Sequence, residues 1–359
     1  MKLENKVSMD DCIRAIPDMI RKNTADAVAL TEPLVCIYRE KNPSHIVIVA
    51  SGSSYNACVT AGPYMQKTLG KVIRIIQPFT FEHYDHDHLS EAMVLFISQS
   101  GNSTNILSAM RFAATQGLET IGLTSDMDSD LARGCMYAID YQIGKEAVGF
   151  VTLGMTGLAL YLMLFALNAA REEDNCSEEA YCLDMTEFRS CPDRFDDVYR
   201  RTKELFETNL VSLISTQHVF VCGCGPGYGV ALEGALKIGE TFGVPTSVFE
   251  TEEYLHGPSF NVNGNYTVLF VDNDDETSVR LHTIYEATRE FTCRAYMISA
   301  SYGNDSRVVK CPKGNPYISV LYKLTFFQYL AYLMTEEMNR WPNERLAARF
   351  DAHTHIKSK

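Results

Sequence analysis

Two short segments rich in serine and glycine follow apolar runs in the first half of the chain. They read SGSS at residues 51–54 and SQSGNS at residues 98–103. Hydroxyl groups and the backbone N–H groups at the start of a helix are donors that bind phosphate. One such segment could equally consist of serines that cap the next helix, but two of them favour an anion site. The residues expected to bind the anion are Gly52, Ser53, Ser54, Ser98, Gln99, Ser100 and Ser103.

The second half carries side chains that could move protons. In LEGALKIGETF, residues 232–242, the spacing of Glu233, Lys237 and Glu240 puts all three on one side of a helix. Such a trio is commonly a solvated row of ion pairs, but it could also supply a general base with an electrostatic partner. His256 stands before Gly-Pro, where a tight turn would aim an imidazole. Histidine exchanges protons near neutral pH, although a lone loop histidine is often only solvated.

An internal repeat indicates which elements must position these residues. Residues 45–57 (HIVIVASGSSYNA) align with 218–230 (HVFVCGCGPGYGV), and residues 93–106 align with 267–280. Each half alternates continuously apolar strands with helices, which is typical of a parallel sheet covered on both faces. We therefore predict an α/β fold of two tandem domains, each a doubly wound parallel sheet whose carboxyl strand ends carry the ligand loops.

The predicted organisation is a helical segment over residues 1–40, a first domain with its linker over 41–190, and a second domain with the C-terminal tail over 191–359. The loop of the second half that aligns with SQSGNS is acidic, DNDDE at residues 272–276. Because such a loop would repel phosphate, we expect one anion site per chain.

Composition restricts the partners and the compartment. A formal net charge of −13 argues against nucleic acid, which requires basic surface. The N-terminus lacks the features of a signal peptide. The most apolar stretch, GLALYLMLFAL at residues 157–167, is shorter than the roughly 20 residues of a membrane span, so it predicts a buried helix. With eleven cysteines in no paired framework, these features favour a cytoplasmic protein without membrane partners.

Two other patterns suggest rival chemistries. GCGPGYG at residues 223–229 is similar to a dinucleotide-binding loop, but it has GxGxG in place of GxGxxG, and the repeat accounts for it better. His83, His86 and His88 could indicate a metal, but their spacing is not that of a helical histidine pair. Neither a metal nor a cofactor is therefore expected.

Four motifs in order resemble the sugar isomerase (SIS) domain family, most closely the ketosamine-6-phosphate deglycases and the isomerase half of glucosamine-6-phosphate synthase. They are SGSSYN (51–56), SQSGNS (98–103), EGALKIGE (233–240) and EEYLHGP (252–258). The resemblance extends from about Met19 to the C-terminus and implies a phosphorylated sugar or amino sugar as substrate.

The resemblance also implies roles for individual residues. The serine loops would hold the sugar 6-phosphate, and Glu240 would move a proton between C1 and C2. His256 would help to open the sugar ring and would enter the site of the partner chain in a homodimer with shared active sites. Lys237, one turn before Glu240, would be its electrostatic partner.

Three features depart from the synthase pattern. The chain has no room for a glutaminase domain, so transfer of ammonia from glutamine is not expected of this chain alone. Where the family often has a Thr-Lys pair, Thr152 is followed by Leu153. The synthases end in a lysine that reaches the sugar, and the tail RLAARFDAHTHIKSK offers three candidates for this contact, Arg349, Lys357 and Lys359, with no choice among them from the sequence.

The predicted function is that of a ketosamine 6-phosphate deglycase, which releases an amine and a hexose 6-phosphate through an enolamine and an imine. An aldose–ketose isomerase or a deaminase of an amino-sugar 6-phosphate needs the same proton transfer and is the alternative. A non-catalytic sugar-phosphate sensor would keep the serine loops and need neither Glu240 nor His256. A transcription regulator would need a basic DNA-binding domain, for which the acidic N-terminal segment leaves no room.

Overall fold

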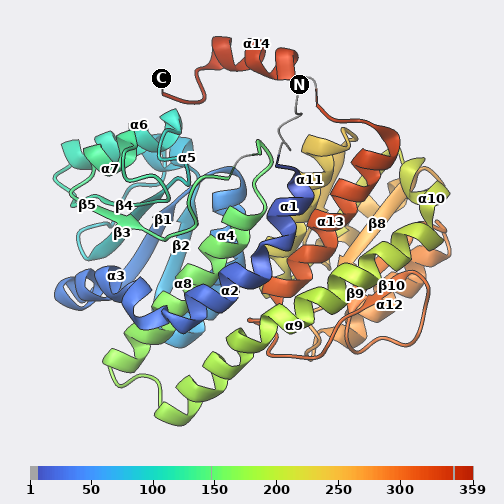
Figure 1. The fold of residues 1–359 in the computed structure, drawn as a ribbon, viewed down its shortest axis with the longest axis horizontal. Coiled ribbons are helices and arrows are strands. Elements are labelled where there is room, and N and C mark those ends of the chain that lie inside the picture. Colours follow the sequence, from blue (N-terminus) through green and yellow to red (C-terminus); the bar gives the residue numbers. More distant parts are fainter. Residues whose placement is uncertain (1–6, 147, 343, 359) are drawn as a thin grey trace, which may run out of the picture. The chain divides into compact units, whose positions relative to one another are not determined.

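The chain folds into two α/β units, seen in a computed structural model that describes residues 7–146, 148–342 and 344–358 (Figure 1). The first unit comprises Met19–Met185 and Asn343–Lys359, and the second comprises Met1–Asp18 and Thr186–Pro342. The chain passes between the units three times: inside the helices α2 (Ile16–Ala25) and α9 (Glu178–Thr208), and between residues 342 and 343.

A five-stranded parallel sheet in the order β2-β1-β3-β4-β5 forms the centre of the first unit. Its strands are β1 (His45–Val49), β2 (Val72–Ile76), β3 (Ala92–Ile97), β4 (Ile121–Thr124) and β5 (Tyr137–Asp140). Its helices are α3 (Ala27–Lys41), α4 (Gly52–Leu69), α5 (Pro78–His83), α6 (Thr104–Thr115), α7 (Asp130–Gly134), α8 (Leu153–Glu172) and α14 (Glu344–Thr354). Because β1 and β3 are parallel neighbours, the loops that follow them emerge at the same edge.

Helices cover both faces of this sheet. Val47, Val49 and Phe96 pack with apolar residues of α5, α6 and α7 in one buried cluster. On the opposite face α4 packs against α8, and α8 against α3. Every residue of α8 from 154 to 170 is buried, which confirms the buried helix predicted for residues 157–167. By length and composition α8 could cross a membrane, but 94% of its apolar window lies inside the structure.

The second unit repeats the plan with the sheet order β10-β9-β8-β6-β7, again fully parallel. Its strands are β6 (His218–Cys222), β7 (Thr246–Phe249), β8 (Tyr266–Val271), β9 (Ala295–Ser299) and β10 (Val308–Lys310). Its helices are α1 (Met9–Arg14), α10 (Leu210–Ile214), α11 (Pro226–Thr241), η1 (Glu253–Leu255), η2 (Pro258–Asn261), α12 (Ser278–Arg289) and α13 (Val320–Met338). As α4 packs against α8, so α11 packs against α13. The predicted fold class of two tandem, doubly wound parallel sheets is confirmed.

The C-terminal tail lies in a different unit from the one that the predicted division gave it. It was expected with the second domain, yet it clusters with the first. The physical reason is backbone pairing: Lys357 forms an antiparallel bridge with Ser103, and the N–H of Ser358 donates to the carbonyl of Asn102 at 2.8 Å. The tail thus extends the edge that carries the second serine segment.

Candidate functional site

A cavity of about 480 Å³ lies at the carboxyl edge of the first sheet, within the size range of small-molecule sites. Four structural parts of the first unit line it: the start of α4, the loop between β3 and α6, Asp126 in the loop between β4 and α7, and the segment between β5 and α8. The tail residues Lys357 and Ser358 complete the lining. The predicted serine segments therefore open into one cavity.

Nearly all of the residues expected to bind an anion line this cavity. They are Ser53, Ser54, Ser98, Gln99, Ser100 and Ser103, together with the tail residue Lys357. Gly52 is not among the lining residues. Its φ of +57° lets the chain enter α4 in a conformation that other residues rarely adopt.

The serines that begin α4 and α6 do not cap their helices. Ser51 is the N-cap of α4 and Ser103 the N-cap of α6, and neither side chain makes a capping hydrogen bond. The hydroxyl of Ser98 donates instead to that of Ser103 at 3.1 Å. The alternative in which the serines only cap helices is therefore wrong for Ser51 and Ser103, and both residues line the cavity.

The loop after β3 is held in shape by its own backbone and by β4. The hydroxyl of Thr124 donates to the carbonyl of Gln99 at 3.1 Å, and the N–H of Asn102 donates to Ser100 Oγ at 3.4 Å. Gly101 has a φ of +63°, and a Cβ there would overlap the side chain of Ser129. Only glycine fits this turn, so the serines on either side are presented by a rigid loop.

Replacing Ser98 and Ser100 by alanine should weaken the binding of inorganic phosphate roughly 100-fold or more, because each lost hydrogen bond to a charged group contributes about 1.5–3 kcal/mol. Isothermal titration calorimetry measures the affinity. Ser108→Ala is the matched control, since Ser108 lies on α6 and bonds to Glu82 away from the cavity. Unchanged phosphate affinity in the double variant would contradict an anion site at this loop.

The segment between β5 and α8 supplies cavity residues that the sequence analysis missed. Lys145 and Glu146 line the wall, and Lys145 Nζ lies 2.8 Å from Oδ2 of Asp126, which also lines it. The hydrogen bond from Lys145 lowers the pKa of the Asp126 carboxyl, so the two charges neutralise each other on the wall. The only signal in the sequence is an acidic residue ahead of an apolar helix. Such a residue has no fixed distance from the helix that would mark it as part of a site.

Gln99 enters the cavity beside the first turn of α8, and this position depends on Gly154. A Cβ at Gly154 would overlap the amide group of Gln99. Gly154→Ala should therefore push this amide aside and lower phosphate affinity about as much as Gln99→Ala does. A calorimetric cycle tests the coupling: the double variant should bind like Gln99→Ala alone. Additive losses would show that Gly154 acts by another route.

The second unit contains the predicted catalytic residues, and α11 buries two of its three charged side chains. Glu233 and Lys237 are 0% and 1% exposed, whereas Glu240 is 30% exposed. Lys237 Nζ lies 3.2 Å from Glu233 and donates a hydrogen bond to Glu240. Burial alone would lower the pKa of Lys237, but the two carboxylates outweigh it and raise the pKa, so the ammonium keeps its charge. A solvated row of ion pairs is thus wrong for Glu233 and Lys237.

His256 lies on the turn between η1 and η2. The residue is exposed, and among the described residues it has no hydrogen bond to Lys237 or Glu240. The next residue, Gly257, has a φ of +125°, and Phe260 is 89% exposed. The turn therefore presents an imidazole and a phenyl ring on the surface of its unit.

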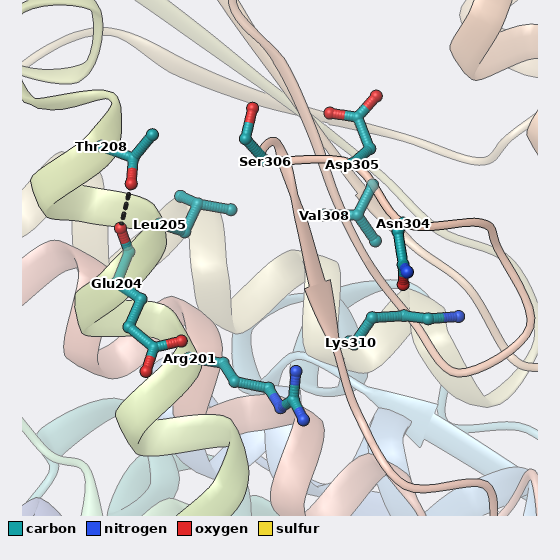
Figure 2. Close-up of a pocket in the computed structure, with 9 residues that line it drawn as sticks. All are labelled: Arg201, Glu204, Leu205, Thr208, Asn304, Asp305, Ser306, Val308 and Lys310. Atoms are coloured by element: carbon teal, nitrogen blue, oxygen red, sulfur yellow. Dashed lines mark hydrogen bonds between the residues drawn. The ribbon is translucent and has the colours of Figure 1, made fainter.

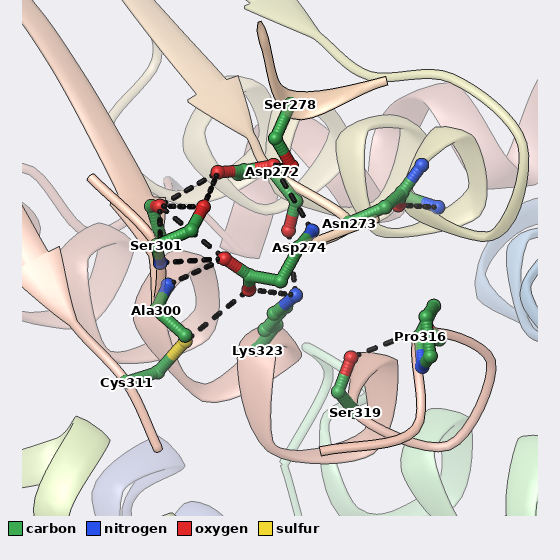
Figure 3. Close-up of polar contacts among 12 residues, drawn as sticks. Asp272, Asn273, Asp274, Ser278, Ala300, Ser301, Cys311, Pro316, Ser319 and Lys323 are labelled. Atoms are coloured by element: carbon green, nitrogen blue, oxygen red, sulfur yellow. Dashed lines mark hydrogen bonds and ion pairs between the residues drawn. The ribbon is translucent and has the colours of Figure 1, made fainter. Parts of the chain in front are cut away.

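The first three residues of the acidic loop, 272–274, are hydrogen-bonded within the second unit, as Figure 3 shows. Asp274 Oδ1 accepts the N–H groups of Ala300 and Ser301 at 2.8 Å each, and its Oδ2 lies 2.8 Å from Nζ of the buried Lys323. Asp272 accepts the hydroxyl of Ser278 at 2.6 Å. Donors at this edge are taken by the chain's own carboxylates.

The glycine-rich loop after β6 is packed against the protein itself. A Cβ at Gly223 would lie 2.7 Å from the carbonyl oxygen of Gly227, and the N–H of Gly227 donates to Asn273 Oδ1 at 3.0 Å. The glycines therefore serve close packing within the unit. This packing explains the GxGxG pattern, so no dinucleotide site is needed to account for it.

A second hollow in the structure and the arrangement of possible metal ligands give weaker support for a functional site. A hollow of about 400 Å³ between α9 and the residues around β10 is shown in Figure 2. Its charged side chains all have partners in the same unit: Arg201 with Asp197, Glu204 with Arg200, Asp305 with Arg289, and Lys310 with the carbonyl of Ala300. Across the described parts of the chain, no group of three or more His, Cys, Asp or Glu side chains could hold a metal.

The SIS domain model matches residues 38–167 and 212–305, more than half of the chain. The chain belongs to the SIS domain family. Both matched stretches contain a strand and loop of the repeat: β1 and β3 with the serine segments in the first, β6 and β8 with the acidic loop in the second.

Several known proteins are similar to the chain in sequence or in fold. The glutamine–fructose-6-phosphate aminotransferase (isomerizing) of Bacteroides thetaiotaomicron is 26% identical over 236 residues, which cover 65% of this chain and 38% of that protein. The chain thus spans less than half the length of this curated relative. A Clostridium difficile 630 protein with a provisional assignment as a phosphosugar isomerase has the same fold, with a TM-score of 0.88, 24% identity, and coverage of 98% of this chain and 99% of that one. The C-terminal domain of the Francisella tularensis glucosamine-fructose-6-phosphate aminotransferase gives a TM-score of 0.81 at 21% identity, with coverage of 93% and 97%. The chain therefore shares its fold with these two proteins.

Proposed function

We propose that the chain is an enzyme acting on a sugar or amino-sugar 6-phosphate, with the phosphate held in the serine cavity of the first unit. The observation that carries this proposal is the convergence of two serine segments, whose N-cap hydroxyls do not cap their helices, on one cavity at the carboxyl edge of a parallel sheet. Ligands bind at this edge in open α/β folds, and helix starts attract anions.

The proposed chemistry is a proton transfer between C1 and C2 of the open-chain sugar. Glu240 is the proposed base: it takes a proton from C1 of a ketosamine and returns it to C2. The proton of the amine passes to the C2 oxygen in the same conversion, so the C2 carbonyl becomes a hydroxyl and an imine forms at C1. Water adds to the imine carbon, and the amine leaves with a proton as the hexose 6-phosphate forms. Lys237 supports this role because it is charged and hydrogen-bonded to Glu240. His256 is proposed to move a proton between the ring oxygen and the anomeric hydroxyl during ring opening.

Within this class we propose a ketosamine 6-phosphate deglycase, in a cytoplasmic homodimer. The order of the motifs SQSGNS, EGALKIGE and HGP supports this choice. An isomerase would stop after the proton transfer, and a deaminase would release ammonia from an amino-sugar 6-phosphate. A sensor would need the cavity, but it would have no use for a buried lysine bonded to a part-exposed glutamate.

Incubation with candidate substrates separates these functions. Fructoselysine 6-phosphate, glucoselysine 6-phosphate, glucosamine 6-phosphate and fructose 6-phosphate are offered separately, and the products are followed by mass spectrometry. A deglycase releases lysine and hexose 6-phosphate from one of the first two. Ammonia from the third indicates a deaminase, and interconversion of the hexose phosphates indicates an isomerase. Binding of all four without turnover would contradict an enzyme and favour a sensor.

A further inference from the structure

The carboxylate of Glu146 occupies the start of α8. Its Oε1 accepts the N–H and the hydroxyl of Thr152, each at 2.8 Å, and the N–H of Leu153 at 3.1 Å. Its Oε2 accepts the N–H of Gly154 at 3.1 Å. Thr152, the N-cap residue, makes no side-chain cap of its own. A residue from outside the helix therefore caps α8 with four hydrogen bonds.

This cap lies on the wall of the serine cavity. Glu146 is a lining residue, and Gln99, which also lines the cavity, has its amide against Gly154 in the first turn of α8. The cavity consequently borders the start of α4, where the serines lie, and the start of α8. Both helix starts would attract an anion, but the N–H groups of α8 already hold a carboxylate. A phosphate that approached α8 would meet the negative charge of Glu146.

One acceptor position of the same carboxylate is still available for a hydroxyl. From the residues that the structure describes, Oε2 accepts a single hydrogen bond, donated by Gly154, and a carboxylate oxygen has two lone pairs. A neutral polyol would therefore be accepted at this wall, where a phosphate would be repelled.

We propose that Glu146 is a positioning residue that sets the direction of the sugar phosphate in the cavity, with the phosphate at the serine loops and the sugar hydroxyls toward the start of α8. This inference rests on the proposed sugar-phosphate function. Glu146 touches no reacting atom. It acts by occupying the start of α8, which would otherwise attract an anion, so that only the start of α4 remains open to the phosphate.

Glu146→Ala tests the inference, because it exposes the N–H groups of α8. In calorimetry with inorganic phosphate, the stoichiometry should rise from one equivalent bound per chain in the wild type to two in the variant. The affinity of the first site should not fall. Turnover of the substrate should fall at least tenfold, because the phosphate then binds in two directions. Formate, a small carboxylate, should restore part of this turnover by re-entering the vacated position. Glu32→Ala, on the surface of α3, is the matched control and should change neither quantity.

Glu146→Gln keeps the position filled and removes the charge, and its amide oxygen can still accept the donors of Thr152 and Leu153. It loses only the hydrogen bond from the N–H of Gly154, which an amide nitrogen cannot accept, so it provides a test if the alanine variant does not fold. It should still bind one equivalent of phosphate, several-fold more tightly, with reduced turnover. Unchanged phosphate affinity and turnover in Glu146→Gln, or one equivalent with normal turnover in Glu146→Ala, would overturn the positioning role. So would joint loss of phosphate binding and turnover without rescue by formate, since that marks a purely structural cap. If the wild type binds no phosphate, it is the proposed function that fails.

Discussion

Replacing Glu240 by glutamine should lower turnover about 100-fold or more and leave the binding of the sugar phosphate nearly intact. The amide keeps the size of the side chain and a contact with Lys237, but it cannot take up a proton. The measurement is kcat from steady-state kinetics beside the dissociation constant from calorimetry. A loss confined to kcat is the result expected when a general base is removed.

Glu233→Gln is the matched control for this variant. It makes the same chemical change on the same helix, next to the same ammonium, at a side chain that is 0% exposed. Turnover should fall far less than in Glu240→Gln, provided that the melting temperature shows a folded protein. Equal losses in the two variants would show that the carboxylates act only through the charge of Lys237. Wild-type turnover in Glu240→Gln would exclude Glu240 as the base.

Mixing two inactive variants should restore activity if two chains share each active site. Glu240→Gln and His256→Ala chains are dissociated, mixed in equal amounts and reassociated. Random pairing makes about half of the dimers hybrid, and one of the two sites in each hybrid is intact, so roughly a quarter of wild-type activity should return. The exposure of His256 and the 89% exposure of Phe260 agree with a turn that enters a partner chain.

The control for this experiment is subunit exchange itself, followed by mass spectrometry or by capture of a tag carried on one variant. Mixing two preparations of Glu240→Gln gives the background. Confirmed exchange without any return of activity would show that each chain builds its site from its own residues. A single species at the mass of one chain under assay conditions would contradict the dimer.

The sequence predicted the fold because its signals are local and repeated. After a first histidine, the runs HIVIV (45–49) and HVFVC (218–222) are apolar and buried at every position. Only strands covered on both faces require this pattern, and both are interior strands of their sheets. The serine segments were found for the same reason, since each directly follows its strand. Loops after neighbouring parallel strands must meet at one edge, so sequence order alone brings them together.

Other features of the site depend on distances that a sequence does not contain. Glu146 caps α8 from six residues before Thr152, and no capping motif has that spacing. The pattern of Glu233 and Lys237 is the same in a solvated helix as in a buried one, so their burial had to come from the packing of α11 against α13. The pairing of Ser103 with Lys357 joins residues 254 positions apart, which a local pattern does not indicate.

The position of the tail has a consequence for how the protein is made. Residues 19–185 supply the whole sheet of the first unit, and this sheet can form early, because domains fold in order as the chain leaves the ribosome. Lys357 and Ser358, which complete the cavity, are synthesised only after the whole of the second unit. A nascent chain that already has both serine loops in place therefore still has an open cavity, and the cavity acquires its last wall only after the strands and helices of the second unit have been synthesised.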